Sequence, residues 1–541
     1  MTSFSPPGPG SWALDRSHYP GGTTRTSKQL LVEGMSGGMR KVMAELGMPA
    51  DTLKAAFVNG FMYTRLVPLI SPDKPSKSLP PKAILKIATR LHPEFRRRNK
   101  TATAILANPP APAILERWRV ELKPKTLETN RRFQFVDLAS LSDVGLSEHW
   151  ESLIKHATQM MVLHFWLHGF DLGPIAQFVA TAQDFGIPPK ESLTALTGAS
   201  PSTTEPKRLL HELRMVVAAN GNVPRSLEDV RHHSPEAARL LDAYLADRQN
   251  LMVTRYDLDG LTLGEMPEVV LTTIMSAEPE VIHDDHKVIA PLRERVAADC
   301  RERFDAELAM ARSVMDMRDD NGPITVEWVA GLLRKSLLEV GRRLVSDGRA
   351  TEVDHAFELE PAEVGPLLTS AIGPLPDQLA KRAAERHAEA LLSPPLTLGP
   401  DEQVPPLDVL PVALRTMVRA VNVAIEHMGM SGAADADPLS GSGVGTTSYR
   451  GRVRRADSPE TAIDLMEPGD VLVVRATSPA FNAVLAIAGA VVTADGGALS
   501  HAAVLARELG IPAVVGARGA LGLVDGSMVE VDPVAGVVRV I

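Results

Sequence analysis

The sequence has little cysteine, few aromatic residues and no apolar run of the roughly 18 residues that a membrane span needs. Its single cysteine, Cys300, cannot form an intrachain disulfide, which is typical of proteins from a reducing compartment. Aromatic residues amount to 4%, and the net charge of −9 arises from mixed signs, so a nucleic-acid-binding surface is not expected. The first residues lack the basic and apolar regions of an export signal. We therefore expect a cytoplasmic protein that binds neither nucleic acid nor a membrane.

A glycine-rich stretch near the C-terminus, residues 495–512, has the pattern of a loop that leads into a short helix. The β-branched run at 490–493 predicts a buried strand before this loop. Ser500 suits a helix N-cap, and Gly510 suits a C-cap. The sequence therefore places His501 in the first turn of a helix that follows a glycine loop.

A histidine in this position suits phosphoryl transfer. Neutral imidazole is nucleophilic near pH 7. The N-terminus of a helix, together with the backbone amides of Gly496 and Gly497, favours an anion at the same place. The local pattern alone is equally compatible with a histidine that caps the helix or packs, so the wider sequence has to separate the two interpretations.

The wider motif consists of Gly496-Gly497-Ala498-Leu499-Ser500-His501-Ala502-Ala503, Ala506-Arg507-Glu508 and Gly510-Ile511-Pro512-Ala513-Val514-Val515-Gly516. It resembles the phosphohistidine signature of the swivelling, or mobile, domain of the PEP-utilising enzymes, which include phosphoenolpyruvate synthase, pyruvate phosphate dikinase and rifampicin phosphotransferase. The resemblance implies a catalytic role for His501. It also implies a phosphoryl-binding loop, whose residues in this sequence are Gly496, Gly497, Ser500, Thr477 and Arg507.

Two positions of this loop need comment. Leu499 stands where the general family pattern favours threonine, so one hydroxyl ligand for the phosphoryl oxygens is lost. Leucine resembles the rifampicin phosphotransferase branch, and the substitution favours a chain similar to that branch. Thr477 begins a Thr-x-Pro turn like that of the family, although the N-cap of the next helix is an alternative role for it.

The N-terminal segment has a second family-like spacing. Trp12, Asp15 and His18 match the Trp-x-x-Asp-x-x-His segment that follows the nucleotide-binding part of rifampicin phosphotransferase-like chains. The resemblance implies that this segment covers part of a substrate pocket. An N-terminal arm held by one tryptophan is the alternative.

The most hydrophobic helix is predicted between Leu146 and Phe170. His164 and His168 lie one turn apart on one face of it. This is the spacing of metal ligands, but the glutamate of a zinc-protease helix is missing between them, so we expect no metal site. A core helix and the wall of an acceptor pocket remain as the two interpretations.

Further candidates come from the middle of the chain. Arg255, Asp257 and Glu265 resemble the middle-domain pattern of the family, in which an arginine and an aspartate precede a Glu-Pro turn. Ion pairs that hold a loop are the alternative role for these side chains. The acceptor-binding candidates are therefore Trp12, His18, His164, His168, Arg255, Asp257 and Glu265.

The predicted fold is multidomain, with a mainly α-helical N-terminal region followed by a small α/β (β/β/α) swivelling phosphohistidine domain. The predicted parts are an extended arm at 1–28, a helical acceptor-binding region at 29–428, a flexible linker at 429–449 and the swivelling domain at 450–541. A division of the helical region near 200–225 is an open alternative. Glycine, serine and small residues after position 428 predict the linker.

These features predict a dikinase-type phosphotransferase subunit in which His501 carries a phosphoryl group to a hydroxyl of a small-molecule acceptor. In the resembling enzymes an ATP-grasp domain charges the histidine with the β-phosphoryl of ATP. Because no such domain is recognisable in this sequence, we expect an ATP-grasp partner in trans that supplies ATP and Mg²⁺, and no cofactor bound by this chain alone. A non-catalytic phosphocarrier or regulatory binding protein, and a degenerate family member, are the alternatives.

Overall fold

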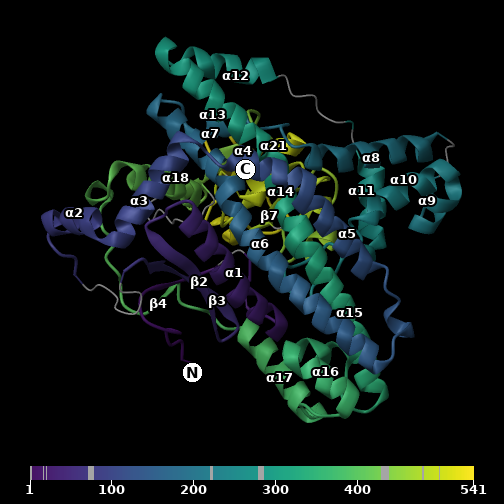
Figure 1. Cartoon of the computed structure of the whole chain (residues 1–541). Coiled ribbons are helices and arrows are strands. Elements are labelled where there is room, and N and C mark those ends of the chain that lie inside the picture. Colours follow the sequence, from purple (N-terminus) through teal and green to yellow (C-terminus); the bar gives the residue numbers. More distant parts are fainter. Residues whose placement is uncertain are drawn as a thin grey trace. The chain divides into compact units, whose positions relative to one another are not determined.

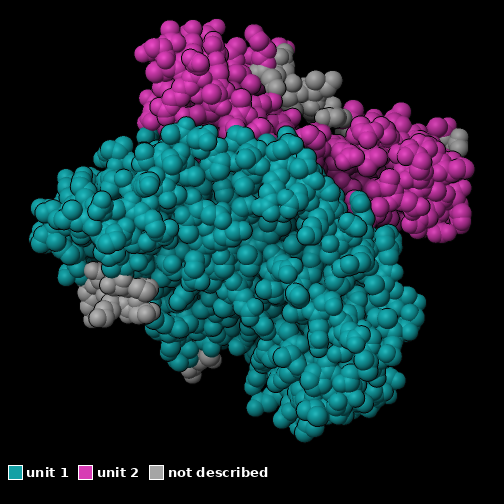
Figure 2. Space-filling view, in the orientation of Figure 1, with its two compact units in different colours: residues 1–170, 256–259, 321–419 teal, residues 171–255, 260–320, 420–541 magenta. Residues whose placement is uncertain are grey.

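The computed structural model describes residues 3–15, 18–19, 21–70, 78–219, 223–277, 279, 285–427, 438–477, 481–498 and 500–541. The chain divides into two compact units (Figure 2). Unit 1 comprises residues 1–170, 256–259 and 321–419, and unit 2 comprises residues 171–255, 260–320 and 420–541. No described helix is both long and apolar enough to cross a membrane.

Unit 1 contains a four-stranded antiparallel sheet with the order β2-β3-β1-β4. Its strands are β1 (Trp12–Leu14), β2 (Ala50–Val58), β3 (Phe61–Pro68) and β4 (Thr397–Leu398). Asn59 and Gly60 form the two-residue turn of the β2–β3 hairpin, and both have positive φ, as a type I′ turn requires. Helix α1 (Arg25–Glu45) packs on β2 (Figure 1).

The predicted helical region at 29–428 thus also contains a β-hairpin, which the sequence analysis did not predict. The Asn-Gly pair between two apolar segments was the signal for it. The strands β1 and β4 are nearly 400 residues apart in the sequence, since Trp12 pairs with Leu398, and no local pattern announces such a pairing.

Helices form most of unit 1. Beside α1 they are α2 (Lys82–Leu91), α3 (Pro93–Ala107), α4 (Ala111–Arg117), α5 (Lys123–Gln134), α15 (Trp328–Ser346), α16 (Pro361–Ser370), α17 (Pro376–Ala390) and α18 (Val412–His427), whose last residues belong to unit 2. Two π-helical turns, η1 (Trp118–Leu122) and η5 (Pro323–Glu327), interrupt this set.

Helix α6 (Asp143–Asp184) runs for 42 residues. The sequence had predicted a helix that ends near Phe170 and shorter helices after Pro174. The helix instead continues through Pro174. Buried residues flank this proline on the same helix, among them Phe170, Ile175 and Phe178, so packing outweighs the lost backbone hydrogen bond.

Unit 2 contains a helical part and a sheet. Its helices before the sheet are α7 (Pro189–Thr194), α8 (Pro201–Ala218), α9 (Leu227–His233), α10 (Pro235–Ala246), α11 (Pro267–Ser276), α12 (Asp285–Glu294), α13 (Arg301–Ser313) and α14 (Met315–Gly322), which ends in unit 1.

The sheet of unit 2 has seven strands in the order β11-β10-β6-β7-β8-β9-β5. They are β5 (Ser442–Val444), β6 (Tyr449–Arg455), β7 (Val471–Val474), β8 (Ala490–Thr493), β9 (Ala513–Val515), β10 (Met528–Asp532) and β11 (Val537–Val540). Strands β6 to β9 are parallel, and α19 (Pro459–Leu465), α20 (Asn482–Leu485) and α21 (His501–Leu509) connect them. The apolar runs in β7, β8 and β9 are fully buried, as central parallel strands require.

The predicted fold class is confirmed, with a mainly helical N-terminal region and a C-terminal α/β part. The N-terminal arm contains β1 and ends in α1, which begins at Arg25. Of the predicted linker, residues 429–437 lie outside the described residues, and residues 442–444 form β5, which pairs with β9.

Candidate active site

The carboxyl ends of parallel strands form the site around His501. Thr477 follows β7, and His501 begins α21 after the loop that follows β8. Because β7 and β8 are neighbours and run in parallel, their carboxyl ends lie at one edge of the sheet. Open α/β sheets bind ligands at this edge. The edge brings Thr477 Oγ1 to 2.9 Å from His501 Nδ1.

Backbone contacts fix the loop before His501. Gly496 has a φ of +115°, which a residue with a side chain rarely adopts. A Cβ on Gly516 would lie 2.6 Å from the carbonyl oxygen of Gly496, so both glycines are needed for this close approach. The Ser500 amide donates to the Gly497 carbonyl at 2.9 Å, and the Ser500 hydroxyl accepts from the Ala503 amide as the N-cap of α21.

The surroundings of His501 keep its ring neutral. Burial, together with the positive charge of Arg318, lowers the pKa of His501 to about 3. Arg318 is on α14 and pairs with Asp319 at 3.0 Å. A neutral imidazole is the nucleophilic form, and the nearby guanidinium charge favours a ring that has gained a phosphoryl anion.

The contact with Thr477 distinguishes the two ring nitrogens. In the tautomer that carries its proton on Nδ1, this N–H donates to Thr477 Oγ1 and the lone pair is on Nε2. In this tautomer Thr477 orients the ring and leaves Nε2 as the nitrogen with a free lone pair. The sequence had predicted Thr477 as a residue of the phosphoryl-binding loop, whereas the structure shows its hydroxyl in contact with the ring of His501.

We expect Thr477→Val to slow phosphorylation of the chain by about tenfold or more, because the ring loses the partner that fixes its tautomer and orientation. The rate of acid-labile label incorporation under single-turnover conditions measures this effect. Thr477→Ser keeps the hydroxyl and should retain most of the rate. Equal rates for the valine variant and the natural chain would contradict the assignment of Nδ1 to Thr477.

The lowered pKa of His501 predicts its reactivity towards diethylpyrocarbonate, which attacks neutral imidazole. Because the neutral form is stable down to about pH 3, carbethoxylation of His501 should continue at pH 5, where an unperturbed histidine is mostly protonated. Peptide mass spectrometry after labelling at pH 5 to 8 measures this, with the exposed His232 as internal reference. A midpoint for His501 near pH 6.5 would contradict the argument.

The remaining residues of the predicted loop differ in their positions. Gly496, Gly497 and Ser500 form the loop as described. Arg507 lies six residues after His501, which corresponds to about 9 Å along the helix. Burial first, and then the charge of Arg507, lower the pKa of Lys190 on α7. Leu499, Ser478 and Pro479 lie outside the described residues.

Comparison with protein families identifies this part of the chain. Residues 466–536 match the model of the PEP-utilising enzyme, mobile domain. The C-terminal α/β part is a mobile domain of the PEP-utilising enzymes. The matched residues include β7, β8, β9, Thr477 and His501, so the match covers the whole edge of the sheet described above.

Curated relatives agree with this identification. Phosphoenolpyruvate synthase of Aeropyrum pernix is 51% identical over 89 residues, which are 16% of this chain and 11% of that protein. An uncharacterized phosphotransferase of Bacillus subtilis is 29% identical over 44% of this chain and 27% of its own length. Chondramide synthase of Chondromyces crocatus is 26% identical over 98% of this chain, which spans only 14% of that protein. The chain is therefore similar to parts of these proteins, and it spans a minor part of the length of each of them.

Outside the mobile domain, three of the acceptor candidates make structural contacts. Trp12 is 5% exposed, and its indole N–H donates to the Gly8 carbonyl at 3.2 Å. Asp257 accepts the Thr24 amide at 2.7 Å and so caps the N-terminus of α1, where the helix dipole favours a negative charge. Glu265 accepts the Thr262 amide at 2.8 Å in a capping box. These contacts give each of the three side chains a structural role that needs no bound acceptor molecule.

Three other candidates gather in unit 1. His18 Nδ1 pairs with Asp15 Oδ2 at 2.9 Å, and the charge of Asp15 raises the pKa of His18. His164 and His168 on α6 approach to 3.2 Å between their Nε2 atoms. Burial first, and then His168 and His18, lower the pKa of His164 well below its usual value. Arg255 belongs to unit 2 and is not part of this group.

Sequence reasoning missed two members of the same cluster. The Tyr256 ring lies tilted against the His18 ring, with centroids 5.7 Å apart, and Glu327 ends the π-helical turn η5. Burial raises the pKa of Tyr256 well above its usual value, and the charge of Glu327 adds to this effect. Tyr256 lies between Arg255 and Asp257, which the sequence had predicted as site residues. The helical pattern around Glu327, in contrast, contains no signal that marks this glutamate as a site residue.

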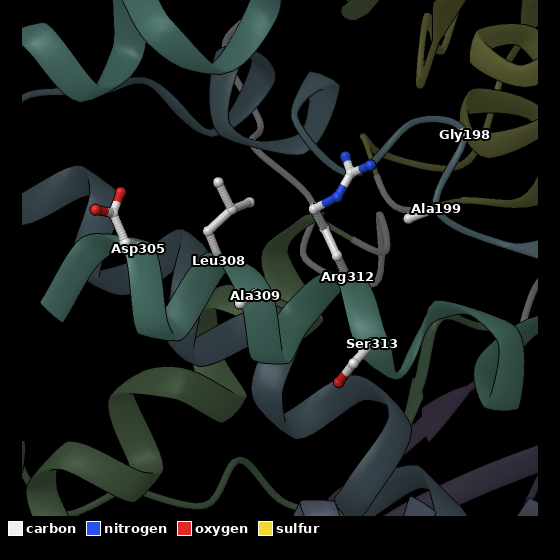
Figure 3. Close-up of a pocket in the computed structure, with 7 residues that line it drawn as sticks. All are labelled: Gly198, Ala199, Asp305, Leu308, Ala309, Arg312 and Ser313. Atoms are coloured by element: carbon white, nitrogen blue, oxygen red, sulfur yellow. The ribbon is translucent and has the colours of Figure 1, made fainter. Parts of the chain in front are cut away.

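Unit 2 also has a surface pocket of about 580 Å³ (Figure 3). Its lining residues are Gly198, Ala199, Asp305, Leu308, Ala309, Arg312 and Ser313. Asp305 accepts from Arg293 at 2.8 Å, and Arg312 donates to the Ala195 carbonyl. Both charged groups of this pocket thus hold neighbouring segments together, and none of the predicted site residues lines it.

Proposed function

We propose that the chain is a dikinase-type phosphotransferase in which His501 carries a phosphoryl group from ATP to a hydroxyl of a small-molecule acceptor. The observation that supports this most directly is the geometry around the ring, a neutral imidazole at the carboxyl edge of a parallel sheet with Nδ1 held by Thr477. An imidazole that only packs in the core would need neither the glycine loop nor this oriented hydroxyl.

The first half-reaction charges His501. We propose that an ATP-grasp protein acts in trans and presents ATP with Mg²⁺. Nε2 of His501 attacks the β-phosphorus, the bond from this phosphorus to the oxygen of AMP breaks, and a phosphorus–nitrogen bond forms. Water then cleaves the bond between the β- and γ-phosphoryl groups, so that the γ-phosphoryl group leaves as phosphate and the β-phosphoryl group stays on Nε2. AMP and phosphate are then released, as the resemblance to pyruvate phosphate dikinase-like enzymes implies. The metal neutralises phosphate charge when it is bound with the nucleotide.

The second half-reaction discharges His501. A hydroxyl of the acceptor attacks the phosphorus, the phosphorus–nitrogen bond breaks, and a phosphate ester forms while the hydroxyl proton passes to a base. We propose that the cluster around His18, His164 and Tyr256 in unit 1 binds this acceptor. The support is its combination of an aspartate-paired imidazole, a second imidazole kept neutral, and a protonated phenol.

The experiment that tests the proposal compares label from β-labelled and γ-labelled ATP. The purified chain is incubated with each, with and without an ATP-grasp protein encoded next to it. We expect acid-labile label on the chain only from the β position and only with the partner. Label from the γ position would contradict the dikinase chemistry, and label that no hydroxyl compound ever removes would favour a non-catalytic phosphocarrier.

A further inference from the structure

Glu327 is a buried carboxyl group with no described partner. Its residue is 3% exposed, and no described side chain or backbone group forms a hydrogen bond or ion pair with it. A lone buried carboxylate is costly, and proteins normally pair it. Its two polar neighbours on the same helical segment, Asn321 and Thr325, bond instead to His164 and to each other.

Apolar side chains around Glu327 form one partly exposed face. We call it the aromatic face; it consists of Met39, Leu53, Phe57, Phe165, Tyr256 and Val326, which all pack on a core cluster containing Met35, Met62 and Met161. Each of these six side chains is only partly buried, so the face still has area that a ligand could cover. Methionine and aromatic side chains suit a flat aromatic ligand.

Glu327, Tyr256 and the histidines share this location. Val326, the neighbour of Glu327, lies in the aromatic face, and the charge of Glu327 acts on Tyr256. The Tyr256 ring lies tilted against the His18 ring, and Phe165 contacts both His164 and His168 at its edge. The aromatic face thus lies next to the histidines and to the carboxyl group of Glu327.

The charged and titratable groups described near the aromatic face differ in how they are compensated. Asp15 pairs with His18, so these two charges cancel. Burial keeps His164 neutral, and burial keeps the Tyr256 phenol protonated. Burial raises the pKa of Glu327 to about 8, and none of the described ion pairs includes this carboxyl group.

We propose that Glu327 pairs with an ammonium group of the acceptor, which is therefore an aromatic hydroxyl compound that also bears an amine. The ring covers the aromatic face, and the amine supplies the charge partner that the fold does not. The inference that the bound compound is the acceptor rests on the proposed function. The binding of an aromatic amine to this site can be measured without any phosphoryl transfer.

The affinity for such a ligand depends on pH with a definite sign. The ammonium pairs with the ionised form of Glu327, and this form is minor below a pKa of about 8 in the free protein. Affinity should therefore rise between pH 6 and pH 8, and binding near pH 7 should release a proton from the carboxyl group. The Asp15–His18 pair, His164, His168 and Tyr256 are the other titratable groups that face the site.

The test compares tyramine with 4-ethylphenol, which has the same ring and hydroxyl but lacks the amine. Isothermal titration calorimetry on the full chain at pH 8 should give an affinity about tenfold or more tighter for tyramine. Glu327→Gln should remove this preference and leave 4-ethylphenol binding unchanged. Glu385→Gln, at an exposed glutamate of the same unit, should change neither affinity.

Three outcomes would overturn the inference: equal affinities for the two compounds, no binding of tyramine, or a preference that survives in Glu327→Gln. Calorimetry in two buffers of different ionisation enthalpy checks the proton release in the same samples. The proposed function is tested separately by label on His501. If His501 is labelled but tyramine binds no more tightly than 4-ethylphenol, the phosphotransferase proposal stands and the proposed amine is wrong. If tyramine binds more tightly but His501 is never labelled, the amine-binding site stands and the phosphotransferase proposal is wrong.

Discussion

Replacement of His501 by alanine should reduce phosphorylation of the chain by at least about three orders of magnitude, because no other group can take over a covalent intermediate at this position. Alanine preserves the helix, since Ser500 still caps α21 and alanine is a strong helix former. The measurement is acid-labile label per chain after incubation with β-labelled ATP and the ATP-grasp partner.

A matched control separates this loss from a general effect on folding. His232 is an exposed histidine on α9 that pairs with Glu228, and His232→Ala should keep full labelling. Equal labelling of the His501→Ala variant and the natural chain would mean that the phosphoryl group is attached elsewhere. The role of His501 as carrier would then be wrong.

Replacement of Arg386 by methionine should destabilise unit 1 by about 3 to 5 kcal/mol, because it leaves buried carboxylates without their cation. The Arg386 side chain is 9% exposed and donates to Glu358 and Asp259, both at 2.6 Å. It also donates to the Gly22 carbonyl at 3.2 Å. Urea unfolding, followed by hydrogen exchange of unit 1 peptides, measures the loss.

Arg382 offers a matched control one turn earlier on α17. It pairs with Glu363 at 2.7 Å, but both side chains are 25% exposed, so Arg382→Met should cost only about 1 kcal/mol. Similar losses for the two variants would contradict the argument from burial. The comparison matters for function because Arg386 holds Asp259, and residues 256–259 include Tyr256 of the proposed acceptor site.

Local signals explain why the mobile domain was predictable from the sequence. The buried strands β7, β8 and β9 are short β-branched runs, and Ser500 and Gly510 stand at the two ends of α21 as predicted. In this domain successive elements pack next to each other in a β-α-β order, so the order in the sequence is also the order in space.

The N-terminal region was less predictable because its decisive contacts are long-range. The hairpin β2–β3 had a local signal in Asn59-Gly60, which a helical period around it obscured. The pairing of β1 with β4 and the insertion of residues 256–259 into unit 1 have no local signal. Helix α6 passes through Pro174 because tertiary packing outweighs propensity there.

The same distinction applies to the site residues. Thr477 and His501 were predicted together because each belongs to a motif, and the sheet brings their side chains to 2.9 Å. His18, His164 and His168 were predicted separately, and only the fold shows that they share a cluster. Glu327 could not be recognised, because a glutamate in a helix is ordinary in sequence and becomes unusual only through its burial.

The most direct test of the account is to locate the phosphoryl group on the charged chain. Peptide mass spectrometry with electron-transfer fragmentation identifies the residue, and ³¹P NMR of the alkaline digest distinguishes the two phosphohistidine isomers. The account predicts one phosphoryl group on His501, attached to Nε2, because Thr477 occupies Nδ1. A phosphoryl group on Nδ1, on another residue or on none would contradict it.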